Sequence, residues 1–210
     1  MHALDRFLPE FHFHERHAIR VRAPTDAVFH AIWDVTLTEM PLVRALFWLR
    51  ALPALLLGRR YRPAGNETKR AAPIPILRAA LARNFVLLHE TPNQEIAVGT
   101  IGRFWQAAGG TARIPDARAF ESFQDPTYAR AGMDFRLTSS SDRLDTHVTT
   151  ETRIQIPDSR ARRRFAVYWL FVYPGSAFIR ILWLRAIKRR AERAYAAHLH
   201  AEQSHVAHLA

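Results

Sequence analysis

The sequence predicts a single α+β domain in which an antiparallel sheet packs against one long C-terminal helix. Several stretches between residues 11 and 156 alternate apolar and polar side chains, as half-buried strands do. Short turn sequences such as Pro92-Asn93 separate successive strands, and connections this short join antiparallel neighbours. The helical stretch that begins after Pro157 is the only long element able to cover the inner face of such a sheet.

Length and composition fit one globular domain. The chain has 210 residues, of which 49% are hydrophobic and 23% charged. It contains no cysteine, which excludes disulfides, thiolate metal sites and cysteine nucleophiles. The net charge of +11 would attract an anionic partner such as a lipid surface, although an excess of arginine over lysine also follows from codon bias.

We expect residues 11–197 to form this domain. Residues 1–10 show no period and are predicted to be a flexible N-terminus, and residues 198–210 a disordered, His-rich tail. The N-terminus carries acidic residues and no apolar run typical of a signal peptide. The prediction is a cytoplasmic protein, with peripheral contact to a membrane as an alternative.

The first half of the domain should hold one strand and several helices. Phe11–Val21 alternates as a strand whose outer face is basic, and a helix follows from Thr25 to about Trp33. A second, strongly apolar helical stretch runs over residues 37–57, and a mobile loop is expected over 58–75. A short helix over residues 76–83 comes next.

The second half should be mostly strands. They are predicted over residues 85–91, 95–106, 118–124, 128–138 and 144–156, and Gly99 and Gly102 permit a bend within the second of these. Together with the first strand this makes a sheet of about six to seven strands. Pro174-Gly175 is expected to kink or interrupt the final helix.

Three segments carry a resemblance to a known group of proteins. They are ERHAIRVRAPTDAVFHAIWD, NFVLLHETPNQEIAVGTIGRFWQ and THVTTETRIQIPDSRARRRFAVYWLFVYPGSAFIRILWLRAIKRRAE. Over residues 11–195 the chain resembles the SRPBCC superfamily, also called START-like, Bet v 1-like or polyketide-cyclase-like. The resemblance implies a helix-grip fold, in which a curved antiparallel sheet wraps around a long C-terminal helix. It also implies an apolar cavity for a small hydrophobic ligand, such as a lipid or a polyketide-like aromatic, but this fold hosts many functions.

Aromatic and apolar side chains on the expected sheet and helix are the candidates for lining this cavity, although an ordinary core would use the same residues. These candidates are Phe104, Trp105, Met133, Phe135, Tyr168 and Trp169.

Glu15 and His17 share the inward parity of the first strand with Ile19 and Val21. In an apolar pocket, such a pair could act as general acid and base of a cyclase- or dehydratase-like enzyme. The alternative is that the two side chains bond to each other and fix structure. Whether the protein is an enzyme therefore stays open.

Other polar patterns favour structural roles. Thr150 and Thr152 should face inward, while Glu151 and Arg153 point outward and pair with a neighbouring strand residue such as Arg103. No nucleotide-binding, hydrolase or zincin motif is present, and His12 and His14 have no third ligand at a suitable spacing. We expect no metal, no cofactor and no nucleic-acid partner, while the oligomeric state is left open.

Arginines open the final helix, where cations oppose the helix dipole. They are Arg160, Arg162, Arg163 and Arg164. This placement points to an anionic partner, such as an acidic side chain, a phosphate or a lipid head group, although a solvated helix face is the more common explanation. The apolar stretch behind them, residues 165–184, is long enough to span a bilayer but carries Pro174 and Arg180. A buried helix, with an end that touches a membrane, is the preferred interpretation.

Overall fold

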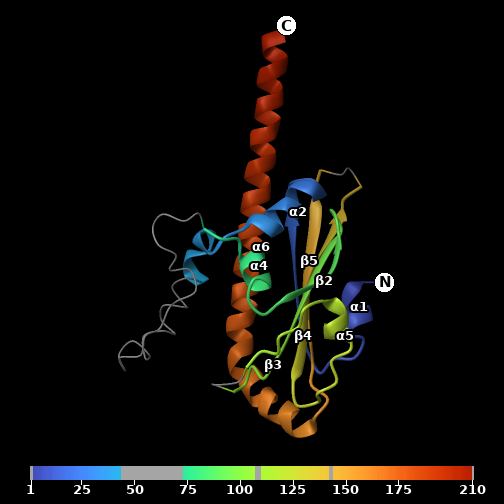
Figure 1. The fold of residues 1–210 in the computed structure, drawn as a ribbon. Helices are drawn as coiled ribbons and strands as arrows, with labels where there is room; N and C mark the ends of the chain where they lie inside the picture. Colours follow the sequence, from blue (N-terminus) through green and yellow to red (C-terminus); the bar gives the residue numbers. More distant parts are fainter. Residues whose placement is uncertain (1, 44–72, 107–109, 142–143, 210) are drawn as a thin grey trace.

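The computed structural model describes residues 2–43, 73–106, 110–141 and 144–209 of the chain. Five antiparallel strands form one open sheet in the order β1-β5-β4-β3-β2 (Figure 1). The strands are β1 (Phe13–Val21), β2 (Val86–Thr91), β3 (Glu95–Gly102), β4 (Ala129–Ser139) and β5 (Thr146–Gln155). The predicted α+β layout, an antiparallel sheet with a long C-terminal helix, is therefore confirmed in broad outline.

The sheet has fewer strands than predicted because residues 118–124 do not form one. They fall largely within α5 (Ala117–Glu121), whose N-terminus is capped by the Asp116 side chain, which accepts a 2.7 Å hydrogen bond from the amide of Ala119. Phe120 is fully buried beneath this helix. One buried aromatic residue and one cap fix a short helix that an alternating sequence pattern does not reveal.

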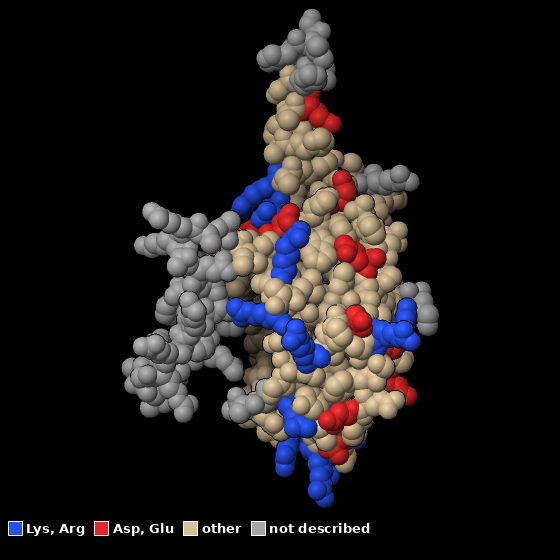
Figure 2. All heavy atoms as spheres, in the orientation of Figure 1, with Lys and Arg blue, Asp and Glu red and all other residues tan. Residues whose placement is uncertain are grey.

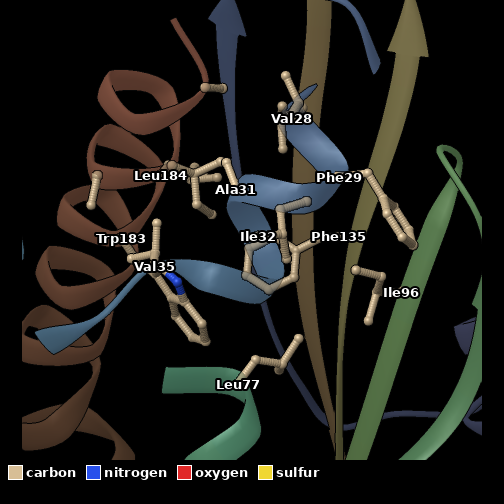
Figure 3. Close-up of a cluster of buried hydrophobic side chains, with 14 of the residues drawn as sticks. Val28, Phe29, Ala31, Ile32, Val35, Leu77, Ile96, Phe135, Trp183 and Leu184 are labelled. Carbon is tan, nitrogen blue, oxygen red and sulfur yellow. The ribbon is translucent and has the colours of Figure 1, made fainter. Parts of the chain in front are cut away.

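The inner face of the sheet packs against α2 (Thr25–Asp34), α4 (Ile76–Leu81) and α6 (Ser159–Leu209). Figure 3 shows the main core between these layers. Val28 and Ile32 of α2 meet Leu184 of α6, and the ring of Phe135 from β4 lies edge-on to that of Trp183, with centroids 5.2 Å apart. The apolar residues of α2 that the sequence predicts to be buried, Val28, Phe29 and Ile32, are buried.

The outer face is covered by α1 (Ala3–Phe7) and α5. The N-terminal segment predicted to be flexible therefore forms a helix, and Leu4 and Phe7 are buried on the sheet. The amide of Ala3 donates a 3.0 Å hydrogen bond to Glu95. A Cβ atom at Gly132 would lie 2.8 Å from the end of the Leu8 side chain, so a larger residue there would have to displace the side chains that dock this segment on β4.

Charged side chains are buried between this N-terminal segment and the sheet. Arg136 lies 3.2 Å from Asp134 and 2.9 Å from Glu151, which also bonds Arg153 at 2.6 Å. Glu151 and Arg153 point outward as predicted, but they pair with each other and with Arg136, Asp5 and His14, and Arg103 is not among these partners. Burial raises the pKa of Asp134 to about 7, against the lowering effect of the neighbouring Arg136.

The helix α6 runs without interruption through Pro174, where a kink or a break was expected. It also continues as far as Leu209, over the tail that was predicted to be disordered. The helix tolerates Pro174 because both this residue and Leu170, whose carbonyl loses its helical partner, are exposed to water. The last part of α6 projects beyond the sheet as a single rod (Figure 1).

The other helices predicted in the first half of the chain lie only partly within the described residues. Leu37–Glu39 forms the 3-10 helix η1, and α4 matches the short helix expected over residues 76–83. Residues 44–72 lie outside the described part of the chain, and with them most of the apolar stretch 37–57 and of the loop predicted over 58–75.

Candidate functional site

A set of polar side chains, which we call the polar group, interrupts the apolar inner face of the sheet and begins at Glu15 and His17 on β1. Alternation along this strand sends Glu15, His17, Ile19 and Val21 to the helix side, as the sequence predicts. Glu15 is only 3% exposed, and its Oε1 lies 2.6 Å from Nε2 of His17. The two side chains therefore form a hydrogen-bonded pair inside the protein.

The long helix supplies two further polar side chains at the same level. The hydroxyl of Ser176 donates a 3.0 Å hydrogen bond to Oε2 of Glu15. One turn further on, Arg180 donates a 2.9 Å hydrogen bond to Thr152 on β5 and contacts the sulfur of Met133. Thr152 pairs with Glu15 across the two strands, so the polar group is continuous from β1 to α6.

The guanidinium of Arg180 lies in an unusually apolar place for a cation. It stacks 5.5 Å from the centroid of the Trp183 ring. Burial lowers the pKa of Arg180 to about 10, while the carboxylates of Glu15 and Asp134 act in the opposite direction. At neutral pH the side chain still carries its charge.

Next to this arginine is a cavity of about 300 Å³, which we call the Arg180 cavity. It opens between α4, the middle of the sheet and α6, and most of its lining is apolar. The lining residues are Ile76, Ala80, Phe85, Thr100, Ala131, Gly132, Met133, Thr152, Arg180 and Trp183. An engineered apolar cavity of about 150 Å³ holds benzene, so this volume has room for a larger apolar molecule.

The residues predicted to bind a ligand are split by the structure into three places. Met133 lines the Arg180 cavity, but Phe135 is fully buried in the main core against Trp183. The other four, Phe104, Trp105, Tyr168 and Trp169, pack against a separate buried cluster that includes Phe165 at the start of α6. Their part in binding stays a prediction, and only Met133 touches the cavity described above.

Glu15 and His17, the candidate acid and base, lie together on β1, yet they do not line the Arg180 cavity. Glu15 and His17 are held by each other and by Ser176, which is the arrangement expected of a structural role. A cyclase- or dehydratase-like reaction at this pair would need a ligand in contact with Glu15 or His17, and neither residue lines the cavity. It stays an alternative prediction.

Sequence reasoning did not select Arg180, Thr100 or Trp183 as site residues. The available signal was Arg180 itself, the only charged residue between Phe165 and Leu184. An arginine in such a stretch that is buried in the fold needs a partner. Thr100 could not be singled out, because nothing in its sequence context distinguishes it from the other inward threonines.

The opposite face of α6 carries an apolar band. Val167, Leu170 and Phe171 are 63%, 72% and 78% exposed, respectively. By length and composition α6 contains a window apolar enough to cross a membrane, and 11% of that window is buried. Helices of soluble proteins also pass this test, so the finding does not decide where the protein resides.

Within the described ranges, no three histidine, aspartate or glutamate side chains gather closely enough to hold a metal ion. His12 instead accepts a 3.1 Å hydrogen bond from the amide of Ile156. Burial and the nearby Arg162 lower the pKa of this histidine.

Comparison with known proteins found no matching family model and no matching curated protein. Among solved structures, protein MLL2253 of Mesorhizobium loti is 13% identical, with a TM-score of 0.35, covering 85% of this chain and 98% of its own. Protein jhp0584 of Helicobacter pylori is 9% identical, with a TM-score of 0.38. The match covers 89% of this chain and 92% of the Helicobacter protein. The Zhui aromatase/cyclase of Streptomyces sp. R1128 is 16% identical, with a TM-score of 0.31. The match covers 86% of this chain and 94% of the Streptomyces protein. Scores this low carry no argument about function, and membership of the SRPBCC superfamily stays a prediction.

Proposed function

We propose that this protein binds a small, largely apolar molecule in the Arg180 cavity. The observation that carries the proposal is a cavity of about 300 Å³ with a mostly apolar lining between the sheet and α6. Ligand pockets in proteins typically have volumes of about 300–1,000 Å³ and few polar groups, so this cavity lies at the small end of that range. A single-ring or two-ring aromatic compound, or a short acyl chain, fits this description.

A cavity-filling substitution tests the proposal. Ala80 lines the cavity from α4, and Ala80→Phe would place a ring inside it. Ala82→Phe is the matched control, because Ala82 is exposed and does not line the cavity. The neutral probe N-phenyl-1-naphthylamine should bind the wild-type protein and the Ala82→Phe variant saturably, and the Ala80→Phe variant at least about tenfold more weakly.

Native mass spectrometry of the gently purified protein provides a second readout, since a bound molecule would add a discrete mass. Equal probe binding by the Ala80→Phe and Ala82→Phe variants would place the ligand elsewhere. An absence of both saturable probe binding and a copurified molecule would overturn the proposal.

A second candidate function, docking on an anionic membrane, is favoured by the apolar band on α6. The exposed side chains Val167, Leu170 and Phe171 follow directly after Arg160, Arg163 and Arg164, which are also exposed. Figure 2 shows basic side chains gathered at the end of the molecule where α6 begins. Apolar side chains that enter the headgroup region beside arginines that attract anionic lipid are the usual combination for surface binding.

Vesicle sedimentation tests this second candidate. The protein should sediment with vesicles containing phosphatidylserine, and the double substitution Leu170→Ser, Phe171→Ser should abolish this binding. Leu199→Ser changes a partly exposed residue far along the same helix and should leave binding intact. No sedimentation at low salt would overturn the membrane proposal, and a wild-type dimer that the double substitution converts to a monomer would show that a second copy covers the band.

A further inference from the structure

The polar groups of the Arg180 cavity share one property, because their hydrogen-bonding capacity is dominated by donors. The cavity is lined by Arg180, Trp183, Thr100 and Thr152 together with apolar side chains. A guanidinium and an indole N–H can only donate, and a threonine hydroxyl can donate as well as accept. Among the described residues that line the cavity there is no carboxylate.

Two of these donors are buried without a partner. Neither the hydroxyl of Thr100 nor Nε1 of Trp183 has a hydrogen bond within the described part of the chain. Thr100 is 4% exposed and Trp183 8% exposed, so bulk water does not satisfy them. Each buried polar group left unpaired costs about 1–3 kcal/mol, and native proteins keep few of them without a reason.

The charge of Arg180 is also uncompensated at close range. Among the described residues, no carboxylate comes within ion-pair distance of its guanidinium, whose hydrogen-bond partners are Thr152 and Met133. The carboxylate of Glu15, whose charge acts on the pKa of Arg180, already has both oxygens bonded, to His17 and Ser176. A buried cation without an ion-pair partner is unfavourable, and an anion brought into the cavity would supply one.

We infer that the ligand of the Arg180 cavity is a small apolar acid whose carboxylate binds Arg180, with Thr100 and Trp183 as further donors. This inference rests on the proposed function and specifies its ligand class. The apolar part of the acid would lie against the side chains of Ile76, Phe85 and Met133. A carboxylate suits the site because an arginine binds it through charge-assisted hydrogen bonds.

Two probes of equal shape, one charged and one neutral, separate the contribution of the ligand's charge to binding from that of its apolar ring. Calorimetric titration of the wild-type protein with 2-naphthoate and with its neutral amide, 2-naphthamide, should give at least about tenfold tighter binding of the carboxylate. Arg180→Met removes the charge and keeps an apolar side chain, so it should abolish this preference. Arg185→Met is the control, because Arg185 is an exposed arginine of the same helix outside the cavity lining, and this variant should keep the preference.

Two milder substitutions keep the inference testable if the Arg180→Met variant does not fold. Trp183→Phe removes only the indole N–H and the fused ring, and Thr100→Val replaces a hydroxyl by a methyl group. Each should weaken binding of 2-naphthoate by about three- to tenfold more than binding of 2-naphthamide. Equal weakening of both probes would indicate that these side chains only shape the cavity and would count against the inference.

The outcomes distinguish this inference from the proposed function. Equal affinity of the wild-type protein for both probes would overturn the acid and leave an apolar site. A preference for 2-naphthoate that persists in the Arg180→Met variant would also overturn it. If neither probe binds, the inference is wrong, and the proposed function is then decided by the binding of N-phenyl-1-naphthylamine and by native mass spectrometry.

Discussion

The hydroxyl of Ser176 donates a hydrogen bond of 3.0 Å to the buried carboxylate of Glu15, and so ties the middle of α6 to the first strand of the sheet. Ser176→Ala would leave one oxygen of this carboxylate without its partner. We expect the free energy of unfolding to fall by about 1–2 kcal/mol, as measured by urea denaturation. Ser122→Ala, at an exposed serine, should change it by less than about 0.5 kcal/mol. Equal effects of the two substitutions would show that the bond contributes nothing.

Burial raises the pKa of Asp134 to about 7 from an ordinary value of 3.8. Between these two values the folded protein keeps a proton that the unfolded chain has lost, so this group makes stability fall as pH rises through that interval. The slope can reach about 1.4 kcal/mol per pH unit.

Asp134→Asn removes this titration. Relative to the wild-type protein, the variant should lose less stability as pH rises from about 4 to 7, which denaturation at several pH values would measure. Asp26→Asn, at an exposed position, should follow the wild-type curve. Parallel curves for the wild-type protein and the Asp134→Asn variant would show that Asp134 is ionised throughout this range.

Gly99 and Gly175 should respond to alanine in opposite directions. A Cβ atom at Gly99 would lie 2.8 Å from the ring of Phe120, whereas one at Gly175 would meet nothing within 4 Å. Gly99→Ala should therefore destabilise the fold by about 1–3 kcal/mol through overpacking. Gly175→Ala should stabilise it by about 0.5–1 kcal/mol, because alanine loses less backbone entropy in a helix. Thermal unfolding of both variants measures whether each substitution raises or lowers stability. A Gly99→Ala variant as stable as the wild-type protein would contradict the packing of α5 on β3.

The N-terminal helix α1 should contribute to the stability of the whole domain. Leu4 is fully buried on the outer face of the sheet, so Leu4→Ala should cost about 2–4 kcal/mol of unfolding free energy. Arg6→Ala removes an exposed ion pair with Glu121 and the contact of the guanidinium with the Phe7 ring, and should cost less than about 1 kcal/mol. Urea denaturation measures both variants, and a Leu4→Ala variant as stable as the wild-type protein would mean that the segment is not docked in solution.

Sequence patterns predicted the parts of the fold that repeat over many residues. The alternation along β1 and along β4 placed Glu15, Val21 and Phe135 on the inner face, where the structure has them. The patterns failed where one contact decides the local structure. Phe120 and the Asp116 cap make a helix of a segment predicted to be a strand, and Leu4 docks a segment whose few residues cannot show a period.

The candidate site was predictable only in part, for the same physical reason. Parity along one strand brings Glu15 and His17 together, so their pairing followed from the sequence. The Arg180 cavity instead joins side chains from α4, three strands and α6, and its position depends on how the elements stack. The aromatic residues Phe104 and Trp105 were attractive candidates by composition, but they pack around Phe165 at the start of α6.

The strand order also has a consequence for how the chain folds. Among the described strands β1 pairs with β5 alone, and Phe13 lies opposite Ile154. The first strand therefore joins the sheet through contacts between residues far apart in sequence. Strands β2 to β5 pair with sequence neighbours and can assemble through shorter loops. High contact order slows folding, so docking of β1 is expected to be a late step. Until β1 docks, the edge of β5 is unpaired and open to pairing with another chain. We therefore expect this protein to aggregate when it is refolded at high protein concentration.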